Sequence, residues 1–289
     1  MTGSNAGDEA VLPRRRWPSR SRTPGQPRPK KSRRGFDFTA VTEDWDTPAS
    51  RTQREAVHLR YRLAADVSEN GVLIEAACGT GFGLAMTRLR TRISVGGDLM
   101  MENLVAGKSR DSGLVLIQHD AEALPYRAGC ADTVACLEAL YYLQRPERFL
   151  EECKRVLRPN GRVLVVVPNP FRPGFSPSPG SRRYFGAQEL LLLFASAGFV
   201  AEVWGAFPSA TDSRRERMIE RARRSAVHLH LLPRTTRMRG LIKRYILRDA
   251  APLSDLTTPI DPAAALSPIG EDGVVNGRWI VLYAIGRRP

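Results

Sequence analysis

The sequence predicts a doubly wound α/β domain, and three observations support this. Short apolar runs alternate with helical patterns through the middle of the chain. Several of these runs are apolar nearly throughout, as expected for parallel strands that are covered on both faces of a sheet. A glycine turn, Gly79-x-Gly81, directly follows the first run. We therefore expect a ligand at the carboxyl ends of the central strands.

Taken in chain order, the elements begin with an amphipathic helix. Thr47 and Pro48 provide a cap and a first-turn proline, and Val57, Tyr61 and Ala64–Ala65 then fall on one side of the helix. The candidate strands that follow span residues 71–76, 92–98, 113–120, 132–139, 161–169, 199–207 and 278–286. Helical patterns lie between them at 82–90, 100–108, 145–157 and 186–198.

The ends of the chain and one internal segment depart from this pattern. Residues 1–35 are rich in Pro, Ser and Arg with almost no apolar pattern, so we expect a disordered basic tail. The α/β core is expected over 36–207. A basic stretch with helical patterns, 208–272, predicts a partly helical insertion or lid before the last strand. That strand, within 273–289, is expected to complete the core sheet.

The net charge of +14 is concentrated in two segments. Residues 1–35 hold ten Arg or Lys against two acids, and residues 213–248 hold twelve against two. Because these segments carry more than the whole net charge, the rest of the chain is slightly acidic. A surface built throughout for nucleic acid is therefore not favoured, although contacts between these segments and RNA phosphates stay open.

The cysteine pattern and the hydropathy of the sequence limit the class of protein. No stretch approaches the roughly 18 apolar residues of a membrane span, and no apolar segment follows the basic N-terminus as in a secretory signal. The four cysteines form no C-x-x-C pair and no zinc spacing. We expect a reduced, cytoplasmic protein without a metal site.

The turn VLIEAACGTGFG indicates which adenosine-containing cofactor the fold binds. A dinucleotide fingerprint has G-x-G-x-x-G spacing and places a pyrophosphate on a helix N-terminus. Here Gly79, Gly81 and Gly83 have G-x-G-x-G spacing, and Glu75 precedes them. A carboxylate there repels a pyrophosphate and attracts an ammonium group. S-adenosylmethionine carries an ammonium and a sulfonium but no phosphate, so the loop favours it over NAD.

Two further acids at strand ends support this interpretation. Asp98 ends ISVGGD, where a carboxylate can accept from both ribose hydroxyls. Asp120 ends the third strand, where it can accept from an adenine amino group while Ala121 supplies a backbone N–H. Strand alternation points His119 to the opposite face, where we expect it to be packed or on the surface. Three acids at successive strand ends form a more specific pattern than the loop alone.

Six motifs between about residues 70 and 205 are shared with a known family: EAACGTG, GGD, DAEALP, EALYYL, RVLRPNG and PNPFRPGFSPSPGSRRYFGAQELLLLFASAGF. On these the chain resembles the class I S-adenosylmethionine-dependent methyltransferases, in particular a bacterial branch that acts on small molecules or sugars. The resemblance covers about half of the chain. In the commonest family pattern a glycine stands where this chain has Ala77, so we expect the methionine end of the cofactor to be slightly displaced.

The resemblance implies a Rossmann-like, seven-stranded, mostly parallel sheet and S-adenosylmethionine as cosubstrate. It also implies a set of cofactor-binding residues: Glu75, Ala77, Gly79, Gly81, Asp98, Leu99, Asp120 and Ala121. It does not identify the methyl acceptor.

Residues after the fourth strand are the candidates for the acceptor side. Methyl transfer requires a nucleophile held close to the methyl group in a dry pocket. Glu138 is expected above the methyl position as an orienter or base, with Tyr141 and Tyr142 as walls. Core packing of the two tyrosines is an equally open interpretation.

Three functions compete on this sequence. The leading one is a methyltransferase of a sugar, nucleotide-sugar or secondary metabolite. The second is an RNA methyltransferase that uses the basic tail and insertion for phosphate contacts, although no N-P-P-Y-type motif follows the fourth strand. The third is a scaffold that binds S-adenosylmethionine without turnover.

Overall fold

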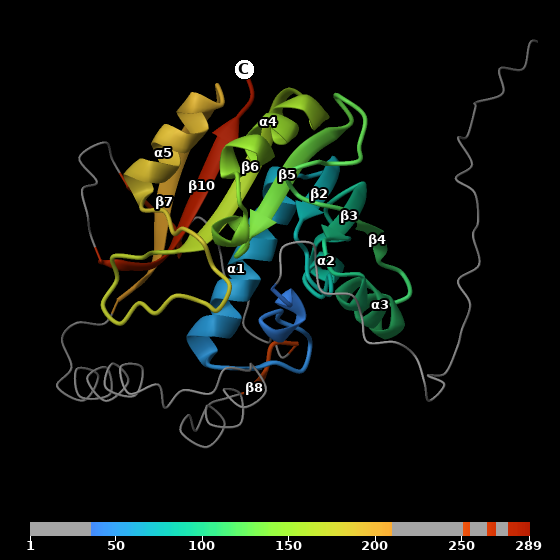
Figure 1. Cartoon of the computed structure of the whole chain (residues 1–289), viewed down its shortest axis with the longest axis horizontal. Coiled ribbons are helices and arrows are strands. Elements are labelled where there is room, and N and C mark those ends of the chain that lie inside the picture. Colours follow the sequence, from blue (N-terminus) through green and yellow to red (C-terminus); the bar gives the residue numbers. More distant parts are fainter. Residues whose placement is uncertain (1–35, 210–250, 255–264, 270–276) are drawn as a thin grey trace, which may run out of the picture.

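The computed structural model of the protein describes residues 36–209, 251–254, 265–269 and 277–289 (Figure 1). The predicted tail and most of the predicted insertion or lid lie outside the described residues. The described helices are α1 (Arg51–Val67), α2 (Leu84–Thr87), α3 (Met101–Arg110), α4 (Pro146–Val156) and α5 (Ala187–Ser196), with 3-10 helices η1 (Phe38–Ala40) and η2 (Leu140–Tyr142). The strands are β1 (Pro48–Ala49), β2 (Val72–Ala76), β3 (Ile93–Asp98), β4 (Val115–Gln118), β5 (Ala131–Leu137), β6 (Leu157–Pro168), β7 (Val200–Pro208), β8 (Ala251–Pro252), β9 (Ser267–Pro268) and β10 (Trp279–Arg287).

The main sheet of the described residues runs in the order β4-β3-β2-β5-β6-β10-β7-β9 (Figure 1). Its first five strands are parallel, and β10 pairs antiparallel with both β6 and β7. The seven strands predicted from the sequence are all present, and the two-residue β9 adds a short edge. The last strand of the chain is thus inserted between two earlier ones. The predicted Rossmann-like, mostly parallel fold is confirmed.

Alternate residues of the central strands pack into two different cores. In β5, Val134 and Cys136 face a core that includes α4 and α5, whereas Ala135 and Leu137 face a core that includes α1. Each strand therefore buries both faces, which is why its sequence is apolar nearly throughout. Because β2 to β5 are parallel, their carboxyl ends meet at one edge of the sheet.

Two predicted helix boundaries were wrong. Ser50, not Thr47, caps α1: its hydroxyl accepts from the Gln53 backbone N–H while the Gln53 side chain accepts from the Ser50 N–H. The stretch 82–90 forms only the four-residue α2. No helix among the described residues has both the length and the apolar character needed to cross a membrane.

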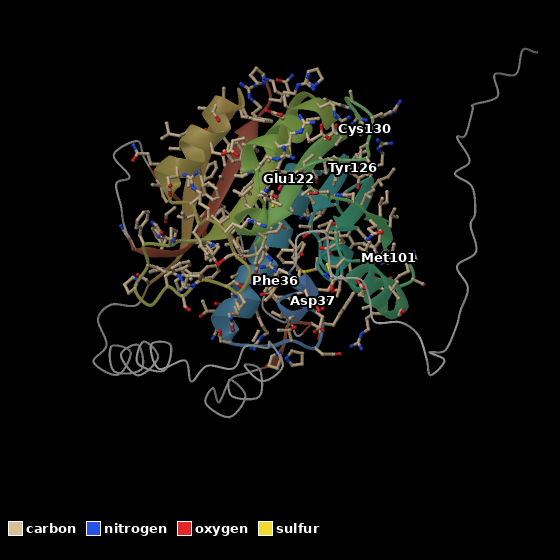
Figure 2. The ribbon with its side chains drawn as sticks, viewed as in Figure 1. Phe36, Asp37, Met101, Glu122, Tyr126 and Cys130 are labelled. Carbon is tan, nitrogen blue, oxygen red and sulfur yellow. The ribbon has the colours of Figure 1, made fainter. Side chains whose placement is uncertain are left out.

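Residues 36–46, which we call the strap, cross the carboxyl edge of the sheet before α1. Phe36, marked in Figure 2, packs edge-on against Phe38 at 5.0 Å between ring centroids. Trp45 packs in the same way against Phe82 of the glycine loop, at 6.0 Å. The strap therefore begins directly after the polar tail and forms part of the folded domain.

Candidate functional site

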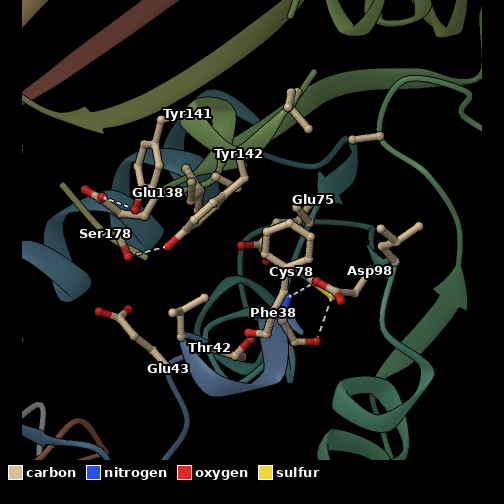
Figure 3. A pocket seen from close by; sticks show the side chains of 18 of the residues that line it. Phe38, Thr42, Glu43, Glu75, Cys78, Asp98, Glu138, Tyr141, Tyr142 and Ser178 are labelled. Atoms are coloured by element: carbon tan, nitrogen blue, oxygen red, sulfur yellow. Dashed lines mark hydrogen bonds between the residues drawn. The ribbon is translucent and has the colours of Figure 1, made fainter. Parts of the chain in front are cut away.

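A cavity of about 260 Å³ lies at the carboxyl ends of β2, β3 and β5 and beside the segment that follows β4 (Figure 3). All predicted site residues except Gly81 line it: Glu75, Ala77, Gly79, Asp98, Leu99, Asp120, Ala121, Glu138, Tyr141 and Tyr142. Figure 3 shows the acceptor-side candidates gathered on one side and Asp98 on the other. The topology therefore brings together residues that are up to 67 positions apart in the chain, from Glu75 to Tyr142.

The glycine loop has the backbone geometry that its sequence predicts. Gly79 and Gly81 have φ angles of 59° and 73°, in the left-handed region that glycine adopts without a steric penalty. The Gly81 N–H closes a turn onto the Cys78 carbonyl at 2.9 Å. A Cβ on Gly81 would come within 3.0 Å of Leu116, so this residue serves the turn rather than the cavity wall.

Asp98 holds the glycine loop in place. Its carboxylate accepts from the Gly79 backbone N–H at 2.9 Å (Figure 3). It also accepts from the Met100 backbone N–H at 2.8 Å and from the Asn103 amide at 3.2 Å. Burial raises the pKa of Asp98, and these three hydrogen bonds oppose the rise. Asp98 therefore joins the end of β3 to the loop after β2, at the position predicted for ribose recognition.

Glu75 is a buried acid with an unsatisfied oxygen. It is 2% exposed, and one carboxylate oxygen accepts from the Tyr61 hydroxyl at 2.9 Å. Its other oxygen, Oε2, has no hydrogen-bond partner among the described residues. Burial raises the pKa of Glu75 to about 7, against the Tyr61 hydrogen bond and the nearby Arg60 charge. A group that fills the cavity with a cationic donor would satisfy this oxygen.

The segment after β4 forms a tight turn beside Asp98. β4 ends at Gln118, and Asp120 follows it in a turn in which its carboxylate accepts from the Glu122 N–H at 3.0 Å. His119 is packed, as predicted, with its ring edge-on to Tyr126 at 5.5 Å (Figure 2 marks Glu122 and Tyr126). It also borders the cavity, which strand alternation did not predict.

Burial lowers the pKa of His119, so the ring is neutral at pH 7. A Cβ on Gly97 would overlap this ring, which explains the second glycine of the GGD motif.

The opposite wall is built from an acid and stacked aromatic rings. Glu138 has a φ of 56°, a conformation that is costly for a residue with a Cβ. Its carboxylate accepts from the Tyr141 hydroxyl at 3.2 Å. The Tyr141 ring stacks on Tyr184 at 4.6 Å, and the Tyr142 hydroxyl is 2.6 Å from the Ser178 hydroxyl (Figure 3). The two tyrosines thus pack in the core and line the cavity at once.

Burial raises the pKa of Glu138 to about 7, and the nearby Arg60 charge opposes the rise. The pKa of this carboxyl group thus lies closer to neutral pH than that of an ordinary glutamate, which suits a group that must take up a proton. Among the described residues, no group of three or more His, Cys, Asp or Glu side chains could hold a metal ion.

Three parts of the cavity wall were missed by the sequence analysis. The strap contributes Phe38, Val41, Thr42 and Glu43, the Pro-rich loop contributes Ser178, and α1 contributes Arg60. The aromatic and apolar residues that resume after the polar tail were an available signal for the strap. A charged residue within the apolar stripe of α1 was an available signal for Arg60. Ser178 had no such signal.

Comparison with known proteins agrees with this site. The profile of a methyltransferase-domain family matches residues 74–165, which include the glycine loop and the acids after β3 and β4. A probable S-adenosylmethionine-dependent methyltransferase of Mycobacterium tuberculosis is 32% identical over 145 residues, 48% of this chain and 52% of the relative. Residues 74–165 therefore form a region similar to a methyltransferase domain, and this chain resembles proteins named as S-adenosylmethionine-dependent methyltransferases. It spans about half the length of the curated relatives it matches.

Other similar proteins differ in what their names describe. A Mycobacterium ulcerans phthiotriol/phenolphthiotriol dimycocerosates methyltransferase is 34% identical over 118 residues, 39% of this chain and 44% of the relative. An Archaeoglobus fulgidus methyltransferase structure has a TM-score of 0.53 at 13% identity, covering 81% of this chain and 94% of its own. The cyclase SpnF also has a TM-score of 0.53, at 20% identity, covering 86% and 85%. The fold is thus shared with a protein named for a different reaction, so function must be argued from the site.

Proposed function

We propose that the protein transfers the methyl group of S-adenosylmethionine to a hydroxyl group of a small molecule, such as a sugar or secondary metabolite. One observation carries this: Glu75 and Asp98 face Glu138 and its partner Tyr141 across a single cavity. The first pair fits the charged and hydroxylated groups of the cofactor. The second pair fits a nucleophile that must lose a proton.

The residues present fit S-adenosylmethionine. The unpartnered oxygen of Glu75 matches the ammonium group, Asp98 matches the ribose hydroxyls, and Asp120 matches the adenine amino group. When bound, the cofactor would supply a methyl group whose carbon–sulfur bond breaks as the acceptor oxygen attacks the methyl carbon in line, with S-adenosylhomocysteine leaving as a neutral thioether. Glu138 would take up the proton of the acceptor hydroxyl as the oxygen–carbon bond forms.

The cavity wall supports a small acceptor over RNA. Its acceptor side is aromatic, with Phe38 edge-on to Tyr142 at 5.3 Å between ring centroids. Arg60 is the one Arg or Lys among the described residues that line the cavity, and it is buried. Phosphate contacts, which dominate RNA affinity, would need several exposed cations there. The relative named for phthiotriol dimycocerosates also supports a small, lipid-type acceptor.

Two measurements test this function. Calorimetry should detect binding of S-adenosylmethionine and of S-adenosylhomocysteine. If millimolar ligand gives no binding heat and no thermal shift, the cofactor assignment is overturned. Methyl-labelled S-adenosylmethionine should then be offered with sugars, nucleotide-sugars, hydroxylated lipids and bulk RNA. Label in one of the small-molecule classes, with little salt dependence, supports the proposal. Label in RNA alone, with a steep salt slope, makes the protein an RNA enzyme.

A further inference from the structure

Arg60 is a charged residue in a position that α1 otherwise gives to apolar side chains. It lies in the stripe that buries Val57 and Ala64, and its side chain is 7% exposed. It borders the cavity between the two halves of the site, near enough to Glu75 and Glu138 to lower the pKa of both. Burying a guanidinium costs free energy unless anions bind it. The partners of Arg60 therefore show whether its charge is fully satisfied.

The partners of Arg60 in the described residues leave it incompletely satisfied. One terminal nitrogen donates to the Glu43 carboxylate at 2.6 Å, and Glu43 is itself 44% exposed. The Nε of Arg60 is buried and has no hydrogen-bond partner among the described residues. Burial lowers the pKa of Arg60, but Glu43 and the other nearby acids outweigh this effect and keep the group charged. Arg60 can therefore accommodate a better-placed carboxylate.

The strap that carries Glu43 also covers the glycine loop. The Thr42 methyl group would lie 2.7 Å from a Cβ on Gly79, and the Thr80 hydroxyl donates to the Glu43 carbonyl at 3.3 Å. The remaining cavity of about 260 Å³ is below the roughly 300–1,000 Å³ typical of ligand pockets. The strap thus packs on the glycine loop and forms one wall of the cavity.

We propose that Arg60 binds the α-carboxylate of the methionine end of S-adenosylmethionine, and that the Glu43 carboxylate, which pairs with Arg60, competes with it. The inference rests on the proposed function. In the cofactor the ammonium and carboxylate are on one carbon, so a site that binds the ammonium at Glu75 needs a cation close by. Arg60 fulfils this, because it adjoins Tyr61, whose hydroxyl bonds Glu75. Exchange of one carboxylate for another preserves the charge balance around Arg60.

The test compares two ligands that differ by this carboxylate alone. Calorimetry should show that the full-length protein binds S-adenosylmethionine about 10- to 100-fold more tightly than decarboxylated S-adenosylmethionine, the range for a hydrogen bond to a charged group. Arg60→Met should abolish this preference, and Arg60→Lys should retain part of it. The control Arg62→Met, on the same helix but paired with Asp66, should leave the preference unchanged.

A second variant tests whether Glu43 is a competitor. Glu43→Gln should raise affinity for S-adenosylmethionine about threefold or more, because a neutral amide holds Arg60 less strongly. Affinity for the decarboxylated ligand should not rise. Asp46→Asn, which removes a strap carboxylate that pairs with Arg110, is the matched control and should have no effect. If Glu43→Gln lowers the affinity for both ligands by the same factor, the proposed competition between Glu43 and the cofactor carboxylate is overturned.

The outcomes separate this inference from the proposed function. If the wild-type protein binds neither ligand, the proposed function fails, and the inference fails with it. If it binds both ligands equally, or if Arg60→Met weakens both by the same factor, the cofactor site stands and the Arg60 assignment is overturned. Because the comparison is a ratio within each variant, a general loss of stability in Arg60→Met cancels; melting curves check that the variant is folded.

Discussion

The two halves of the cavity are built in different ways. On the cofactor side, Asp98 is fixed by backbone N–H groups, and the loop follows the glycine pattern of its own sequence. On the acceptor side, Tyr141 and Tyr142 are fixed by side chains of the Pro-rich loop and the strap, which are distant in sequence. The first half therefore depends on local backbone geometry, and the second on the packing of separate segments.

This difference has a consequence for how the two halves can change. Backbone contacts can be kept by many sequences, so a cofactor site of this kind can stay constant while the loops around it change. The acceptor wall can change by single substitutions in Phe38 or Ser178 without disturbing Asp98. We therefore expect substitutions on the acceptor side to change turnover and substitutions on the cofactor side to change cofactor affinity.

The largest expected effect is on turnover, from the acceptor side. Glu138→Gln should lower kcat by about 10²- to 10⁴-fold, the usual contribution of a general base, because the amide cannot take up the hydroxyl proton. The Kd for S-adenosylhomocysteine should change less than threefold. Transfer of labelled methyl to the acceptor class that the wild-type protein methylates measures kcat. Calorimetry measures the Kd. Glu151→Gln, an exposed acid on α4, is the control; equal kcat values in both variants would remove Glu138 from the chemistry.

The next effect is on cofactor affinity. Asp98→Ala should weaken S-adenosylhomocysteine binding by about 1.5–3 kcal/mol, the value of hydrogen bonds to a charged group. It should also lower the free energy of unfolding by about 1–3 kcal/mol, because the Gly79 and Met100 N–H groups lose their acceptor. Calorimetry and urea unfolding measure these quantities. Asp120→Ala, which removes the acceptor of the Glu122 N–H at the end of the neighbouring strand, is the comparison. An unchanged Kd in Asp98→Ala would show that it serves the loop alone.

The same contrast explains what the sequence could predict. The sheet and the positions of Glu75, Asp98 and Asp120 follow from apolar periodicity and glycine spacing, which are local signals. Which other side chains border the cavity depends on where the strap and the Pro-rich loop pack, and no local pattern encodes that. The α1 boundary was misplaced for a related reason, since both Thr47 and Ser50 are good caps and the capping box with Gln53 decides between them.

A smaller effect should appear in the pH dependence of binding. The pKa of Glu75 is raised from its ordinary value of 4.5 to about 7, so in the empty protein it is largely protonated below pH 7. An ammonium group binds the ionised form, and affinity for S-adenosylhomocysteine should fall up to tenfold per pH unit below 7 and level off above it. Glu75→Gln keeps an acceptor for Tyr61 but should bind weakly with a flatter profile from pH 6 to 8.

The stability of the empty protein should have the opposite dependence on pH. Because the folded pKa of Glu75 is raised, its contribution to stability is fully present below about pH 4.5 and is lost as pH rises through about 7. Urea unfolding of wild type and Glu75→Gln at several pH values measures the difference between them. A difference that does not change with pH would show that Glu75 is already ionised in the empty site.

The smallest effect concerns backbone strain on the cofactor side. Ala77 has a φ of 60°, where a Cβ costs about 1–2 kcal/mol, and a glycine there costs about 0.5–1 kcal/mol in unfolded-chain entropy. Ala77→Gly should therefore stabilise the protein by about 0–1.5 kcal/mol and raise Tm by up to about 6 °C. Gly79→Ala should do the reverse, because its Cβ would meet Thr42 at 2.7 Å. A lower Tm in Ala77→Gly would mean that the alanine side chain makes contacts worth more than the strain. A glycine at position 138 would relieve the same backbone strain, but it would also remove the proposed base. Backbone strain can therefore be relieved without loss of turnover only on the cofactor side.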